Sequence, residues 1–72
     1  MEREHRGWSI VIHSYESQPR KWRPIVTVSI EREPSDRVTR RLPTPADWAF
    51  DTEQESDEQG YQLAITWIEE GS

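Results

Sequence analysis

The chain contains no cysteine and no long apolar run, and each absence narrows what it can be. Without cysteine there is neither a disulfide nor a thiolate metal site, which fits a reducing compartment such as the cytosol. No apolar stretch approaches the ~18 residues of a membrane span. The charged start, residues 1–6, is unlike a signal peptide. We therefore expect a cytoplasmic protein that does not enter a membrane.

Hydrophobic residues are also scarce, at 32% of the chain, and charged residues make up another 32%. A chain of 72 residues forms one domain, here residues 1–72, with a small core. The apolar residues are nevertheless patterned, and four of them are tryptophans, each able to bury on the order of 200 Å². This patterning predicts a folded domain rather than a disordered chain.

Basic residues are absent from the second part of the sequence. All nine lie within residues 1–41, together with six acidic residues, whereas residues 42–72 hold eight acidic residues. The formal charges of the two parts are therefore +3 and −8, which together give the net charge of −5. Such a separation favours partners of opposite sign for the two parts.

Alternation of apolar and polar residues predicts three strands, over residues 8–15, 22–32 and 37–42. The β-branched density of the second segment is typical of a strand. In the third segment Arg40 falls on the inward face, which suits an edge strand where the guanidinium can reach solvent. Residues 1–6 carry no such pattern and are expected to be a flexible tail. The sequence does not define the order of the strands in the sheet.

A helix is predicted over residues 53–70. Thr52 and Glu55 have the spacing of a capping box, and Gly71 is placed to end the helix. Gly60 falls inside the helix, where glycine costs about 1 kcal/mol relative to alanine. We interpret it as a point of close approach to a tryptophan ring of the sheet.

These elements predict an α+β fold, in which a three-stranded antiparallel β-β-β meander is covered on one face by the C-terminal helix. Trp8, Trp22 and Trp67 are expected to form one cluster beneath that helix. Trp48 lies in the connector between the third strand and the helix, where it either covers this core or is an exposed anchor for a partner. The second face of the sheet is expected to remain open.

The sequence predicts neither a metal site nor a cofactor. Each of the two histidines, His5 and His13, lacks further ligands at a suitable spacing. The acidic start of the helix imitates a calcium loop, but Ser56 stands where that loop needs glycine and Gln62 where it needs glutamate. His13 and its neighbour Ser14 point to opposite faces of a strand, so they do not form a catalytic pair. We therefore expect a protein that is not an enzyme.

The most plausible function is a non-enzymatic module for protein interaction or self-association. Two surfaces motivate this interpretation: the mildly apolar open face of the sheet, and the acidic start of the helix at residues 53–58. The partner is then an unknown protein or a second copy that forms a homodimer. The candidate contact residues are Val11, Tyr15, Ile25, Trp48, Glu53 and Asp57.

The alternative is a weak nucleic-acid-binding domain that uses a basic face of the sheet. Basic and aromatic residues are interleaved in the strands, as in many nucleic-acid-binding surfaces. Every contact with a phosphate would then be sensitive to salt. The candidate contact residues for this alternative are Arg20, Lys21, Arg23, Arg40 and Arg41.

Three motifs carry a resemblance to a known group of proteins. They are Gly7-Trp8-x-Ile10, Trp22-x-Pro24-x-Val26, and Phe50-x-Thr52-x-x-Glu55 followed by Ala64-x-x-Trp67-Ile68-Glu69. Together they resemble small, stand-alone bacterial proteins of uncharacterised function that have three strands and one helix. The likeness extends from about Gly7 to Glu70 and implies a fold but no activity.

A fainter resemblance is to the three-stranded DNA-binding domains of tyrosine recombinase arms and of plant ethylene-response factors. Those domains also pass from three strands through Phe-x-Thr-x-x-Glu into a helix. In them, Arg and Trp side chains on the open face of the sheet enter the major groove. The resemblance implies the same role for Arg23 and Arg41 in this chain.

Overall fold

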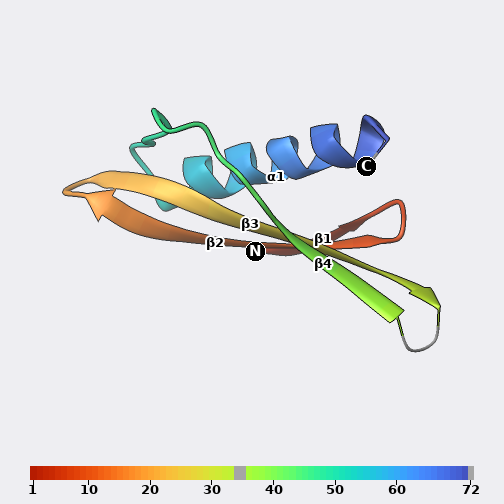
Figure 1. Cartoon of the computed structure of the whole chain (residues 1–72). Coiled ribbons are helices and arrows are strands. Elements are labelled where there is room, and N and C mark those ends of the chain that lie inside the picture. Colours follow the sequence, from red (N-terminus) through yellow and green to blue (C-terminus); the bar gives the residue numbers. More distant parts are fainter. Residues whose placement is uncertain (34–35, 72) are drawn as a thin grey trace.

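The computed structural model describes residues 1–33 and 36–71 as a four-stranded antiparallel sheet with one C-terminal helix (Figure 1). The predicted α+β class is confirmed. Each strand pairs with the next one along the chain, so the sheet is a meander in the order β1-β2-β3-β4. The elements are β1 (Glu2–His5), β2 (Trp8–Gln18), β3 (Lys21–Glu33), β4 (Asp36–Leu42) and α1 (Glu53–Glu69).

The prediction of three strands is wrong, because residues 1–6, which were expected to be a flexible tail, contain the additional strand β1. In β1, Glu2 lies opposite Val11 and His5 opposite Trp8. The turn between β1 and β2 consists of Arg6 and Gly7, with φ angles of 50° and 84°. A type I′ hairpin turn has positive φ at both central residues, and its twist matches that of the paired strands. Backbone pairing thus forms β1 without an apolar face of its own.

The two central strands extend beyond their predicted ends. β2 continues to Gln18, and β3 begins at Lys21. Between them, Pro19 precedes Arg20, which has a φ of 63°; proline followed by a left-handed residue is the φ pattern of a type II turn. The segment between the second and third predicted strands includes residues 34–35, which lie outside the described part of the chain.

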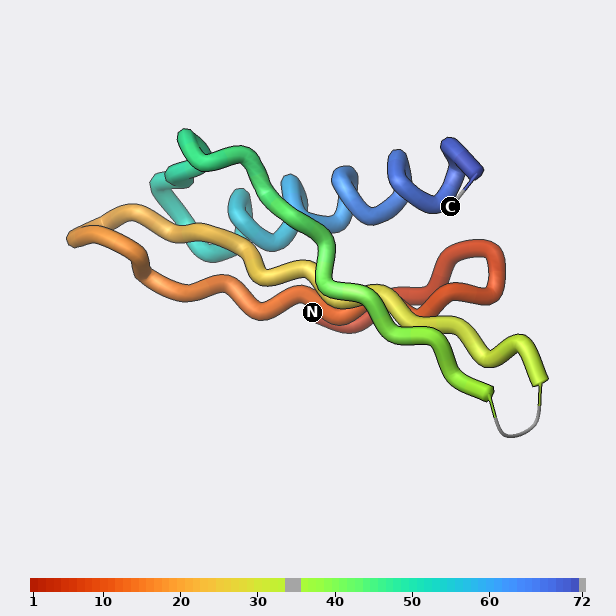
Figure 2. The backbone as a smooth tube through the Cα atoms, in the orientation of Figure 1, coloured from red at the N-terminus to blue at the C-terminus, as the bar shows by residue number. Residues whose placement is uncertain are grey.

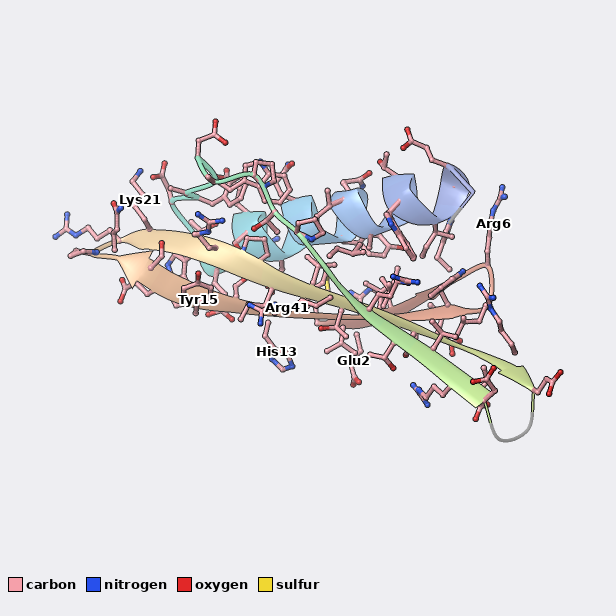
Figure 3. The ribbon with its side chains drawn as sticks, in the orientation of Figure 1. Glu2, Arg6, His13, Tyr15, Lys21 and Arg41 are labelled. Carbon is pink, nitrogen blue, oxygen red and sulfur yellow. The ribbon has the colours of Figure 1, made fainter. Side chains whose placement is uncertain are left out.

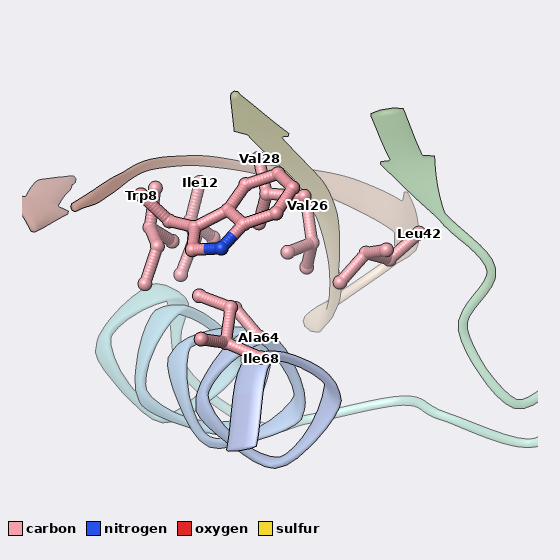
Figure 4. Close-up of a cluster of buried hydrophobic side chains, with 8 residues drawn as sticks. Trp8, Ile12, Val26, Val28, Leu42, Ala64 and Ile68 are labelled. Atoms are coloured by element: carbon pink, nitrogen blue, oxygen red, sulfur yellow. The ribbon is translucent and has the colours of Figure 1, made fainter. Parts of the chain in front are cut away.

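The core lies between the sheet and α1 (Figure 4). Trp8 packs edge-to-face on Trp67, with ring centroids 5.1 Å apart, which confirms that part of the predicted tryptophan cluster. Trp22 is not in this cluster: its backbone pairs with Phe50 of the connector instead, at N–O distances of 2.8 and 2.9 Å. The buried apolar residues are Trp8, Ile10, Ile12, Val26, Val28, Leu42, Ala64 and Ile68.

Helix α1 begins and ends near the residues that the sequence indicates. The Thr52 side chain accepts a hydrogen bond from the backbone N–H of Glu55 at 3.0 Å, as a capping residue does. The helix ends at Glu69, and Gly71 follows with a φ of 88°. Within the described residues, no helix has the length and apolar character needed to cross a bilayer.

A row of small residues brings α1 close to the sheet. Ser56, Gly60 and Ala64 are buried at successive i, i+4 positions. A Cβ atom on Gly60 would lie 3.0 Å from the Cβ of Pro24 and 3.1 Å from a methyl group of Ile12. The predicted close approach at Gly60 is therefore confirmed, but the neighbouring side chains are aliphatic rather than a tryptophan ring.

Candidate protein-interaction surface

Helix α1 covers one face of the sheet, and no other element in the described part of the chain covers the opposite face. Figure 3 shows Glu2, His13 and Tyr15 on the side of the sheet that points away from the helix. Side chains alternate between the two faces along each strand, and residues paired across strands share a face. We call the uncovered side the open face; it consists of Glu2, Glu4, Ser9, Val11, His13, Tyr15, Arg23, Ile25, Thr27, Ser29, Glu31, Arg37, Thr39 and Arg41.

The open face brings together three of the six predicted protein-contact residues. Val11 and Ile25 are half-buried, and Tyr15 is the one exposed large hydrophobic side chain among the described residues, at 45%. They lie on the two central strands, where His13 is paired with Ile25. These three residues form an apolar strip on the open face that begins at Val11, between β1 and β3, and continues along β2 and β3 beyond the ends of the two outer strands.

Charged residues lie at the two edges of the open face. One row crosses all four strands: Glu2 is paired with Val11, Val11 with Thr27, and Thr27 with Arg41. The row therefore has a carboxylate at one end, a guanidinium at the other, and the uncharged side chains of Val11 and Thr27 between them. Its charged ends lie on β1 and β4, the two outer strands.

Each outer strand presents charges of one sign on the open face. In β1, Glu4 lies two residues after Glu2 and shares its face; in β4, Arg37 shares the face of Arg41. The Arg37 guanidinium donates to the Ser29 hydroxyl at 2.9 Å, which holds it over the sheet. The sequence analysis did not identify Glu2 and Glu4 because it assigned no strand to the N-terminus. Their i, i+2 spacing, which places both on one face of a strand, was the signal that could have found them.

Two shallow depressions border β1. One, of about 410 Å³, is lined by Glu2, Arg3, Glu4, Ser9, Ile10 and Val11. The other, of about 300 Å³, is lined by Glu4, Gly7, Ser9, Ser29, Ile30, Glu31 and Arg37. The small side chains of Ser9 and Ser29, which are paired across β2 and β3, leave the second hollow in the open face. Within residues 1–33 and 36–71, no group of His, Asp and Glu is arranged to hold a metal ion.

The other three predicted protein-contact residues lie away from the open face. Trp48 packs edge-to-face on Phe50 of the connector, with ring centroids 5.4 Å apart, so it neither covers the main core nor stands fully exposed. Glu53 is exposed in the first turn of α1. Asp57 accepts a hydrogen bond from the Ser14 hydroxyl at 2.5 Å, which ties α1 to β2. Asp57 therefore has a role within the domain.

Figure 2 shows the path of the connector that joins β4 to α1. Two of the predicted nucleic-acid contacts bind this connector. The guanidinium of Arg23 donates to the carbonyl oxygens of Ala46 and Pro45 at 2.9 and 3.1 Å. The ammonium group of Lys21 lies 2.5 Å from a carboxylate oxygen of Asp51. This hydrogen bond and the charge of Lys21 lower the pKa of Asp51 below its ordinary value of 3.8.

The remaining predicted nucleic-acid contacts do not share a surface. Arg40 is paired with the buried Val28, so it lies on the side of the sheet that faces α1, whereas Arg41 lies on the open face. Arg20 is in the turn at the end of the β2–β3 hairpin, with its backbone N–H donating to Glu16. The five basic residues therefore do not form one continuous patch.

In comparisons with protein-family models, curated proteins and solved structures, none matches this chain. The two resemblances based on short motifs therefore remain expectations.

Proposed function

We propose that this chain is a non-enzymatic self-association module in which the open face joins two copies into a homodimer. The observation that carries the proposal is the exposed apolar strip of Val11, Tyr15 and Ile25, on a sheet face that no element of residues 1–33 and 36–71 covers. Antiparallel sheets commonly pack one face on a core and leave the other for water or a second sheet. An exposed apolar strip with a polar border favours packing against the sheet of another copy over exposure to water.

The open face has a suitable size for this role. Strands of a sheet lie about 4.8 Å apart and rise about 3.4 Å per residue, so four strands, two of them of 11 and 13 residues, present several hundred Å². A standard protein–protein interface buries about 800 Å² on each partner. The 35 residues of the four strands thus span roughly 600 Å², so a second sheet that packs on this face would bury somewhat less than a standard interface, as in a weaker, reversible complex.

The positions of the basic residues favour self-association over nucleic-acid binding. Lys21 is paired with Asp51, and Arg23 is occupied by the carbonyl groups of the connector. Phosphate binding needs several basic groups on one surface, and Arg40 and Arg41 lie on opposite faces of β4. The net charge of −5 also opposes the approach of a polyanion.

Sedimentation equilibrium with a matched pair of variants tests this proposal. Val11→Lys places a charge in the centre of the apolar strip, whereas Thr66→Lys places the same charge on an exposed position of α1. We expect the wild type and Thr66→Lys to form dimers and Val11→Lys to remain monomeric, because an interfacial ammonium group loses its hydration without a partner. Circular dichroism of each variant checks that the fold is retained. A monomeric wild type, or dimers of all three proteins, would contradict the proposal.

A further inference from the structure

The charges on the open face are sorted by strand. On β1 the open face carries the carboxylates of Glu2 and Glu4, and on β4 it carries the guanidinium groups of Arg37 and Arg41. These are the two outer strands of the sheet, so one edge of the open face is acidic and the opposite edge is basic. Val11 lies between these two edges, and Tyr15 and Ile25 continue the apolar strip towards the β2–β3 hairpin, beyond the ends of β1 and β4.

Two identical sheet faces related by a two-fold axis in the plane between them can be stacked in two ways. An axis parallel to the strands places β1 of one copy over β4 of the other. An axis perpendicular to the strands places β1 over β1 and β4 over β4. Both arrangements are isologous, with the same surface patch on each copy, and both keep the strands of the two sheets aligned, as packed sheets prefer.

We propose that two copies dock with β1 of each over β4 of the other, about a two-fold axis parallel to the strands. This inference rests on the proposed function and specifies the geometry of the same interface. In this arrangement the carboxylates of Glu2 and Glu4 in one copy face the basic edge formed by Arg37 and Arg41 in the other, and the contact occurs twice. The alternative axis places acid over acid and base over base, and such juxtaposition of like charges opposes association.

The same axis also pairs the middle of the two faces. β2 of one copy lies over β3 of the other, so Val11 falls on Thr27 and His13 on Ile25 of the second copy. Tyr15 falls on Arg23, whose guanidinium is bound to the connector. The charged edges therefore determine the choice of axis, and the middle of the face is compatible with it.

Charge reversal at each edge tests the docking. Glu2→Arg/Glu4→Arg makes both edges basic, Arg37→Glu/Arg41→Glu makes both acidic, and the fourfold variant exchanges the two edges while keeping the net charge of −5. We expect each one-edge variant to dimerise at least about ten-fold more weakly than the wild type, because two attractive edges become repulsive. The fourfold variant is expected to dimerise as the wild type does. Glu53→Arg/Glu58→Arg, which changes exposed residues of α1, is the control for net charge.

A mixing experiment gives a second result. Native mass spectrometry of ¹⁵N-labelled Glu2→Arg/Glu4→Arg mixed with unlabelled Arg37→Glu/Arg41→Glu is expected to show mainly mixed dimers, since each basic edge of one variant then lies over an acidic edge of the other. If the wild type, the two one-edge variants and the fourfold variant all dimerise equally well, the proposed docking is overturned, whereas the proposed function stands. A wild type that stays monomeric would overturn both.

Discussion

At the scale of single residues, Gly60 shows how closely the helix approaches the sheet. An added Cβ would lie 3.0 Å from Pro24 and 3.1 Å from Ile12 and Val26, closer than such atoms normally pack. The pyrrolidine ring of Pro24 cannot rotate away. Glycine at this position therefore permits the contact between α1 and the two central strands, although it is a poor helix former.

Gly60→Ala is expected to destabilise the domain despite the better helix propensity of alanine. The propensity gain is about 1 kcal/mol, whereas crowding a packed core costs about 1–3 kcal/mol, so we expect a net loss of about 1 kcal/mol in the free energy of unfolding. Urea unfolding measures it. Gln59→Ala, at the exposed neighbouring position, is the control and should be close to neutral. An increase in stability for Gly60→Ala would show that the sheet relaxes around the new methyl group.

At the scale of elements, the connector of residues 43–52 is held to β3 by side chains that the sequence suggested for nucleic acid. Arg23 donates to its backbone carbonyl groups, and Lys21 pairs with Asp51. The Trp22–Phe50 backbone pair lies between these contacts. Together they fix the direction in which the chain enters α1.

Lys21→Met is expected to raise the pKa of Asp51 towards its ordinary value, because both causes of the lowered pKa come from Lys21. A carboxyl group whose pKa is lower in the folded state stabilises the fold above its unfolded pKa, and this contribution disappears as the pH falls through the folded pKa. The difference in stability between wild type and variant should therefore be present at neutral pH and vanish in acid. NMR titration of the Asp51 carboxyl carbon measures the shift. Arg20→Met, which removes a neighbouring charge, should leave the pKa of Asp51 low; an unchanged pKa in Lys21→Met would contradict the assignment.

The elements with a strong local signal could be predicted, and those formed by tertiary pairing could not. The alternation of Trp8, Ile10 and Ile12 and the capping contact of Thr52 located β2 and the start of α1. β1 consists of charged residues and histidine, so its hydrogen bonds to β2 and the Arg6-Gly7 turn, not an apolar pattern, define it. The pairing of Trp22 with Phe50 likewise depends on the path of the connector, which the sequence does not specify.

At the scale of the whole molecule, the separation of charge along the sequence becomes a separation within the sheet. Successive residues of a strand point to opposite faces, so basic neighbours such as Arg40 and Arg41 are divided between the two faces of the sheet. On the open face this alternation leaves acids on β1 and bases on β4. Sequence reasoning identified Val11, Tyr15 and Ile25 on this face from their period of two, but it could not find the complementary edges without the register of all four strands.

The most direct measurement of the central claim is a dilution series of ¹⁵N–¹H NMR spectra of the wild-type chain. If the open face joins two copies, the amide signals of Val11, Tyr15 and Ile25 should shift with concentration, and those of exposed α1 residues such as Gln62 and Thr66 should not. The half-shift concentration then gives the dissociation constant. Signals that do not change with concentration, or changes confined to α1, would contradict the account.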